Sequence, residues 1–378
     1  MNVVFFLVDD LGWSDIGCYG SRFYETPNID NFAKESVRFT SAYAACHVNS
    51  PSRASILTGK YPASLNLTDW LPGRRDFPFQ KLLNVPVSRH LPYDGTTIAK
   101  ELQGQSYVLE GDGDDDSIDR KDVQSHEGYR IFPDRTVKIK QLQDNVEFAA
   151  MVESMDESFG RALEELKVLG IDDRTIVIFY SDNGGMSAAN FYDPNRVIRE
   201  NELDKAYSTS NLPLRGGKGW LYEGGIRVPL IIKWPGKGLR NVICDVPVTG
   251  PDFFPTILDM SGIQMKPWVK SDGVSFAPLL RGETKIDRDA IFWHFPHYSN
   301  HGMQSPGGAV RCGDYKLLEY YENNTVQLFN LKNDKEERHD LASSEPEMAN
   351  KLREMLHNRR KQVNAKTMEL NPEYKVVK

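Results

Sequence analysis

Two short apolar runs stand out in the pattern of hydrophobic and polar positions, and each ends in paired polar side chains. The first covers residues 3–8 and precedes Asp9 and Asp10. The second covers residues 175–180, and Asp182 and Asn183 follow it after a serine. Runs of this length are too short to cross a membrane and are typical of buried strands in a parallel sheet. The sequence therefore predicts two strands that end in oxygen-bearing side chains.

Helical and strand-like segments alternate through about residue 260. Residues Glu147–Leu166 are apolar at spacings of three and four, which predicts an amphipathic helix just before the second strand. After Gly262 the segments Ala290–His294, 309–311, Tyr315–Glu319 and Gln327–Leu331 predict antiparallel strands, followed by a helix from Pro346 to about Lys361. We expect an α/β fold with a doubly wound mixed sheet over residues 1–262 and a smaller C-terminal α+β subdomain over residues 263–378.

The polar pairs at the two strand ends predict a metal site. Ligands of open α/β sheets bind beyond the carboxyl ends of the strands. Asp9, Asp10, Asp182 and Asn183 would place four oxygen donors around one point, and hard oxygen ligands suit Ca²⁺ or Mg²⁺. The alternative is that each pair is only a turn at the end of a strand, since Asp and Asn are common turn residues.

A motif in residues 45–60, ACHVNSPSRASILTGK, resembles the signature of the type I sulfatases. That signature is Cys/Ser-x-Pro-x-Arg, followed by a helical run that ends in Thr-Gly. Pro51 and Arg53 stand in the matching places, but Asn49 stands where the family has the Cys or Ser that is oxidised to formylglycine. The resemblance implies an alkaline-phosphatase-like fold, sulfuric ester hydrolysis, and calcium held by the strand-end residues. It also implies that Arg53 braces the nucleophile and the metal ligands.

Asn49 changes the expected chemistry, because a carboxamide has little nucleophilicity whereas the hydrated aldehyde of formylglycine attacks sulfur. Three explanations stay open for this residue: an inactivating substitution, a naturally non-catalytic homologue, and a modified residue written as Asn. This form is expected to be inactive as a sulfatase. The runner-up functions are a non-catalytic protein that binds sulfated sugars and a phosphatase or phosphodiesterase of the alkaline phosphatase superfamily.

Further segments indicate how a sulfated saccharide would be bound. Residues Leu214–Pro229 resemble the sulfatase segment in which a lysine contacts the sulfate, and Lys218 takes that position. In the loop that follows residue 293, His294, His297 and His301 could hydrogen-bond a sugar or its sulfate. The alternatives are a solvated lysine in a Gly-rich loop and structural histidines.

One region departs from the family. A helix is expected to begin near Thr96, but the Gly-Lys-Trp-His-Leu-Gly strand that should follow it, with a Lys and a His serving the nucleophile and leaving group, has no match in the sequence. The later His before Thr-Pro is also missing. An internal stretch of the family domain is thus expected to be absent near residues 104–145.

Composition and charge restrict the classes of binding partner that we expect for this chain. The net charge of −7 over 378 residues argues against a nucleic-acid partner. No apolar run approaches the roughly 18 residues that a membrane span needs. The four cysteines have no metal-ligand spacing. Because sulfatases of this type are usually exported, the resemblance implies a periplasmic or secreted protein whose leader has been removed. The sequence does not indicate an oligomeric state.

Overall fold

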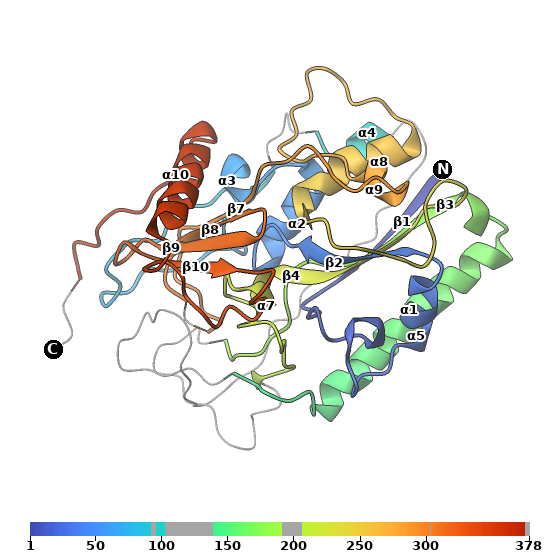
Figure 1. Ribbon diagram of the computed structural model, residues 1–378, viewed down its shortest axis with the longest axis horizontal. Helices are drawn as coiled ribbons and strands as arrows, with labels where there is room; N and C mark the ends of the chain where they lie inside the picture. The colour runs from blue at the N-terminus through green and yellow to red at the C-terminus, as the bar shows by residue number, and fades with distance from the viewer. Residues whose placement is uncertain (92–95, 103–138, 191–205, 303, 375–378) are drawn as a thin grey trace.

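The computed structural model describes residues 1–91, 96–102, 139–190, 206–302 and 304–374. Its main layer is a six-stranded sheet in the order β1-β3-β4-β2-β5, with β6 paired to β2 (Figure 1). The strands are β1 (Asn2–Val8), β2 (Val37–Tyr43), β3 (Thr175–Ser181), β4 (Arg227–Lys233), β5 (Val242–Cys244) and β6 (Val248–Thr249). Strands β1 and β3 are the two apolar runs that the sequence predicts.

The main sheet is mixed. Strand β1 lies parallel to β3, from Asn2 opposite Thr175 to Val8 opposite Ser181. Strand β4 is antiparallel to both of its neighbours, β3 and β2, and β2 is parallel to β5 and β6. The expected mixed sheet is thus confirmed, and β1 and β3 end side by side at the same edge.

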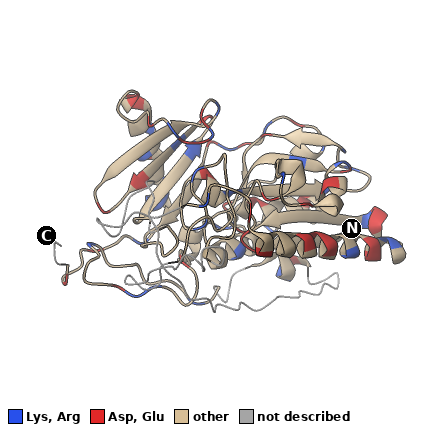
Figure 2. Ribbon diagram, turned by 90° about the horizontal axis from the view of Figure 1, so that it is seen from below, with Lys and Arg blue, Asp and Glu red and all other residues tan. Residues whose placement is uncertain are grey.

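Helices cover both faces of this sheet (Figure 1). Side chains of a strand alternate between faces, and β3 shows this directly. Val177 and Phe179 pack with α1 (Pro27–Ala33) and α5 (Val146–Val168). Ile176, Ile178 and Tyr180 face the other layer, which is built from α2 (Asn49–Thr58), α4 (Ile98–Leu102), α8 (Phe253–Ser261) and α9 (Ala277–Leu280). Helix α5 matches the predicted amphipathic helix, and its outer side carries acidic residues (Figure 2).

The C-terminal part is a four-stranded antiparallel sheet in the order β10-β9-β8-β7, with α10 packed on one face. The elements are β7 (Ile291–Phe295), β8 (Gly307–Cys312), β9 (Tyr315–Tyr320), β10 (Thr325–Asn330) and α10 (Pro346–Gln362). The predicted strands and helix are confirmed here. The core of the main sheet reaches as far as Leu280, so residues 276–280 pack with the first layer although they follow residue 262.

Short helical turns complete the chain: η1 (Gly17–Tyr19), α3 (Pro62–Leu65), η3 (Asp172–Arg174), α7 (Glu223–Ile226) and η5 (Gly250–Asp252). Within the described ranges, every helix is too short or too polar to cross a membrane. The predicted stretch near residues 104–145 falls mostly on residues 103–138, which lie outside the described part of the chain.

Candidate active site

The ends of β1 and β3 bring four polar side chains together, because the two parallel strands stay in register up to Val8 and Ser181. The amide of Asp10 donates to Asp182 Oδ1 at 3.2 Å, and Asn183 Nδ2 donates to Asp10 Oδ1 at 2.7 Å. Carboxylate oxygens of Asp9, Asp10 and Asp182 lie within 4.8 Å of one another. The predicted convergence of the two strand ends is therefore present in the structure.

These carboxylates repel one another and are partly withdrawn from water. Burial and the charges of Asp9 and Asp10 raise the pKa of Asp182 to about 7. Burial and the neighbouring Asp10 also raise the pKa of Asp9. In addition, Asn183 Oδ1 is buried and has no hydrogen-bond partner in the described part of the chain. A cation that accepts oxygen ligands would satisfy this oxygen and offset the repulsion, so the residues fit Ca²⁺ or Mg²⁺.

Helix α2 delivers Asn49 and Arg53 to the same cluster. Asn49 is the first residue of the helix, and Arg53 lies one turn further on the same side. Arg53 Nε donates to Asp182 Oδ2 at 2.8 Å, and its Nη2 donates to Asp9 Oδ1 at 2.7 Å. The side-chain amide of Asn49 donates to that same Asp9 oxygen. Asn49 therefore lies at the edge of the carboxylate cluster, beside the arginine.

Lys218 comes from a segment far along the chain and contacts the cluster at Asp10. Its Nζ lies 2.6 Å from Asp10 Oδ2. Burial alone would lower the pKa of Lys218, but attraction to Asp10 and Asp9 outweighs burial and raises it. The backbone amide of Lys218 donates to Gly185 O at 3.0 Å, which fixes the segment against the turn after Asn183. Gly219 N donates to His47 O at 3.1 Å and so joins the same segment to the chain just before α2.

A buried charge network holds the Lys218 segment on the C-terminal sheet. Lys316 Nζ on β9 lies 3.0 Å from Glu223 Oε1 and 2.8 Å from Glu337 Oε1, and all three side chains are fully buried. Glu223 N donates to Glu337 Oε2 at 2.7 Å. Sequence reasoning missed this network, although Lys316 shares the inward face of β9 with Leu318 and Tyr320. A lysine at an inward position of a predicted strand was the sequence feature that could have indicated this buried network.

The three predicted substrate histidines lie in different surroundings. His301 borders the Lys218 segment, because a Cβ on Gly219 would lie 2.4 Å from His301 Cβ. His297 is buried, and its Nε2 lies 2.9 Å from Thr68 Oγ1. His294 points toward α10, with Nδ1 2.8 Å from the Tyr321 hydroxyl and Nε2 2.8 Å from Lys366 O. These partners favour a structural role for His294.

His47 is a site residue that the sequence did not single out. It lies two residues before Asn49, is fully buried, and neither ring nitrogen has a partner in the described part of the chain. Burial, followed by the charge of Arg74, lowers the pKa of His47 to about 3. Its ring packs 4.1 Å from the ring of Phe295. His47 is therefore a neutral imidazole that lies two residues before the start of α2.

Comparison with known proteins places these features in a family. Over residues 1–109 and 82–263 the chain matches the model described as "Sulfatase", and over residues 217–366 it matches "N-sulphoglucosamine sulphohydrolase, C-terminal". A relative named "Sulfatase" from Formosa agariphila is 27% identical, with 94% of this chain and 88% of that protein covered. Arylsulfatase A of Homo sapiens is 26% identical, with 83% and 74% covered.

A solved structure shares the fold. The crystal structure of Ps i-CgsB in complex with k-i-k-neocarrahexaose superposes with a TM-score of 0.69, covers 94% of this chain and 91% of that chain, and is 23% identical. The alignment with the Formosa protein runs over 508 positions, which exceeds the 378 residues of this chain by 130. The family match is also split into two pieces that overlap between residues 82 and 109. The family model accounts for well over half of the sequence, and we conclude that this chain belongs to the sulfatase family of hydrolases.

Proposed function

We propose that this chain binds the sulfate ester of a carbohydrate at a Ca²⁺ site, with Mg²⁺ as the alternative cation, and that it does not hydrolyse the ester. The observation that carries this proposal is the contact of Asn49 with Asp9, beside Arg53 and within the carboxylate cluster. Carboxylates and a guanidinium surround the nucleophile position, and the residue that occupies it is a carboxamide.

Each residue has a defined task in this proposal. Asp9, Asp10, Asp182 and Asn183 would hold the cation through their side-chain oxygens. A bound Ca²⁺ would supply positive charge against the sulfate oxygens. Lys218 adds a compact positive charge beside Asp10, and Arg53 keeps Asp9 and Asp182 in place through its two donors.

Asn49 explains the loss of turnover. Hydrolysis of a sulfate ester begins with attack of an oxygen nucleophile on sulfur, and the bond from sulfur to the sugar oxygen then breaks. The amide oxygen of Asn49 is delocalised into the C–N bond and is a poor nucleophile. Its amide nitrogen donates to Asp9 and offers no lone pair for attack. The neighbouring Ser50 carries a hydroxyl, but its Oγ accepts a hydrogen bond from Leu71 N at 3.1 Å, and His47 is fully buried.

Several observations support a carbohydrate as the substrate class. The structurally similar Ps i-CgsB is described in complex with k-i-k-neocarrahexaose. In this chain, the Cβ and backbone carbonyl of His301 lie against Gly219, next to Lys218, which makes His301 the candidate among the three histidines for contact with the sugar. His297 stays a weaker candidate, since Thr68 already occupies its Nε2.

A phosphatase or phosphodiesterase is the less favoured function. Members of that group need a second metal site built from additional Asp and His ligands. In the described part of the chain, Asp9, Asp10 and Asp182 form the single group of three or more such ligands. The geometry of the described residues therefore offers one cation position.

Restoring the nucleophile tests the proposal. Asn49→Cys, co-expressed with a formylglycine-generating enzyme, should release sulfate from 4-nitrophenyl sulfate if the chain carries the remaining catalytic groups. Asn49→Ala is the matched control and should release none. Rapid hydrolysis by the unchanged Asn49 protein would show that the nucleophile argument is wrong.

A further inference from the structure

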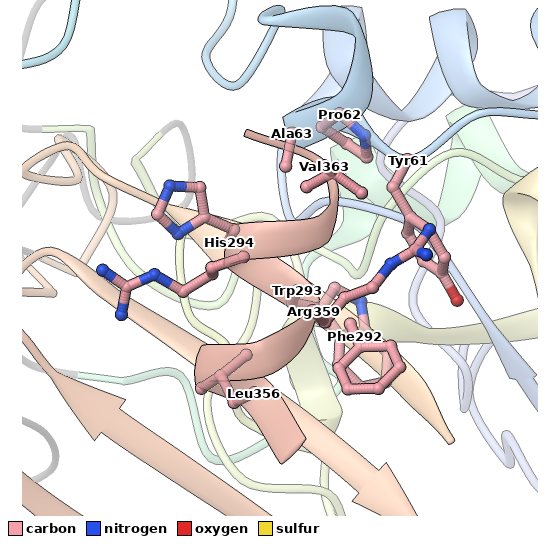
Figure 3. Close-up of a pocket in the computed structure, with 10 residues that line it drawn as sticks. Tyr61, Pro62, Ala63, Phe292, Trp293, His294, Leu356, Arg359 and Val363 are labelled. Carbon is pink, nitrogen blue, oxygen red and sulfur yellow. The ribbon is translucent and has the colours of Figure 1, made fainter. Parts of the chain in front are cut away.

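The C-terminal sheet has a cavity on the face turned toward α10. Side chains of β9 alternate, so Lys316 and Tyr320 face α7, whereas Glu319 faces α10. Between α10 and the sheet lies an open cavity of about 270 Å³, whose polar lining includes Glu319, Tyr321, Asn324, His357, Arg360 and Thr367. A narrower, mostly apolar crevice, lined by Tyr61, Phe292 and Arg359, adjoins it at His294 (Figure 3). The cavity is thus on the opposite face of the sheet from Lys218.

The charges around this cavity are unbalanced. Glu319 pairs with Arg353 Nε at 2.8 Å, with His357 Nε2 at 2.7 Å and with Arg360 Nη1 at 3.3 Å. The three basic residues follow one face of α10 at spacings of four and three. In the described part of the chain, Glu319 is the one carboxylate that pairs with Arg353 and Arg360. Among the described residues, two guanidinium groups thus share one carboxylate, even with His357 neutral.

Arg360 is prepared for a further partner. Its guanidinium carbon lies 4.6 Å from the ring centre of Tyr321, within the range of a cation–π contact. The Tyr321 hydroxyl is in turn fixed by His294 Nδ1 at 2.8 Å. The buried Nε of Arg360 has no hydrogen-bond partner among the described residues. A guanidinium in this state offers donors in one plane, which suits an oxyanion.

The geometry points to a second binding site, in which this α10 cavity takes one anionic sugar unit through its sulfate or carboxylate group. Arg360, which lines the cavity, would bind the oxyanion. Asn324 and Thr367 would reach the sugar hydroxyls, as amide and hydroxyl groups do in saccharide sites. His357 and Arg360, which line the cavity, keep 41% and 21% of their side-chain surface exposed, so a ligand can reach them. This site would hold a saccharide chain independently of the cation at Asp9 and Asp182.

Calorimetry in EDTA separates this site from the metal centre. Galactose 6-sulfate and galacturonic acid should bind the unchanged protein without Ca²⁺, and galactose should bind at least tenfold more weakly. Arg360→Gln should weaken both anionic ligands at least tenfold, about 1.4 kcal/mol. Lys361→Gln removes the same charge from the exposed next residue and should leave the affinities unchanged.

Two controls keep the test decisive. If Arg360→Gln fails to fold, Thr367→Trp is the substitute variant. The larger side chain should fill the cavity and block binding, while the ion pairs of Glu319 stay in place. Inorganic sulfate that binds as tightly as galactose 6-sulfate would reveal a site for free anions and overturn the assignment to sugars. Equal affinities in the unchanged, Arg360→Gln and Thr367→Trp proteins would overturn the proposal of a second site, and so would no binding in EDTA. Loss of Ca²⁺-dependent binding alone would instead contradict the proposed function of the metal site.

Discussion

Lys218 Nζ lies 2.6 Å from Asp10 Oδ2, so the lysine proposed to bind sulfate forms an ion pair with a carboxylate proposed to bind the metal. Without a metal, the Asp10 carboxylate pairs with the Lys218 ammonium group and neutralises its charge. A divalent cation would compete for that carboxylate and leave Lys218 available to an anion. Ca²⁺ and sulfate should therefore bind with positive coupling, and each should raise the affinity for the other by the same factor.

Lys218→Met tests this coupling. In the unchanged protein, saturating Ca²⁺ should tighten binding of inorganic sulfate and of galactose 6-sulfate about tenfold or more, a typical coupling of 1–3 kcal/mol. In Lys218→Met the Ca²⁺-dependent binding of both anions should weaken, and the effect of Ca²⁺ should shrink. Calorimetric titrations with and without Ca²⁺ measure this. Full coupling in the variant would assign it to the metal alone.

His301→Ala separates sugar recognition from anion recognition. His301 borders Gly219 beside Lys218, so its loss should remove contacts to the sugar while the carboxylate cluster stays unchanged. Galactose 6-sulfate should bind about tenfold more weakly, about 1.4 kcal/mol. Affinities for Ca²⁺ and inorganic sulfate should stay within a factor of two. An unchanged affinity for the sugar would leave His301 with a structural role.

Lys316→Met should destabilise the protein through the network that carries the Lys218 segment. Glu223 and Glu337 would be left fully buried without their shared cation. Breaking a buried pair in this way lowers the free energy of unfolding by about 3–5 kcal/mol. Urea denaturation measures the loss, and adding Glu337→Gln should restore part of it. Lys332→Met is the control, because Lys332 is 71% exposed and its 3.7 Å pair with Asp314 should contribute less than about 1 kcal/mol. Equal losses in both lysine variants would contradict the assignment.

His294 should make stability depend on pH. Burial, followed by the charge of Arg360, lowers the pKa of His294 to about 3 in the folded state, against about 6.5 in the unfolded chain. Below pH 6.5 the unfolded state binds the extra proton, so this contribution to stability is lost as the pH falls, by about 1.4 kcal/mol per pH unit. Relative to His294→Phe, the unchanged protein should lose about 2 kcal/mol between pH 6.5 and 5. A stability difference that does not vary with pH would contradict this.

The sequence predicted the strand-end cluster because parallel strands bring consecutive polar pairs to one edge, and Asp9, Asp10, Asp182 and Asn183 follow that rule. It could not predict the partners of His294 and His297, since Tyr321, Lys366 and Thr68 are distant in the chain and are brought near by packing. The network of Lys316, Glu223 and Glu337 was missed for the same reason. Phe276–Leu280 pack with the core of the main sheet, which a short apolar segment does not indicate by its sequence alone.

The most direct test measures binding and turnover in one sample. The unchanged protein is mixed with Ca²⁺ and galactose 6-sulfate, with Asp182→Asn as the variant that removes one proposed ligand of the cation. Calorimetry should show Ca²⁺-dependent binding of the sugar, lost in Asp182→Asn, while ion chromatography of the same solution should show no released sulfate. Sulfate release above the rate without protein, or sugar binding in Asp182→Asn that still depends on Ca²⁺, would contradict the account.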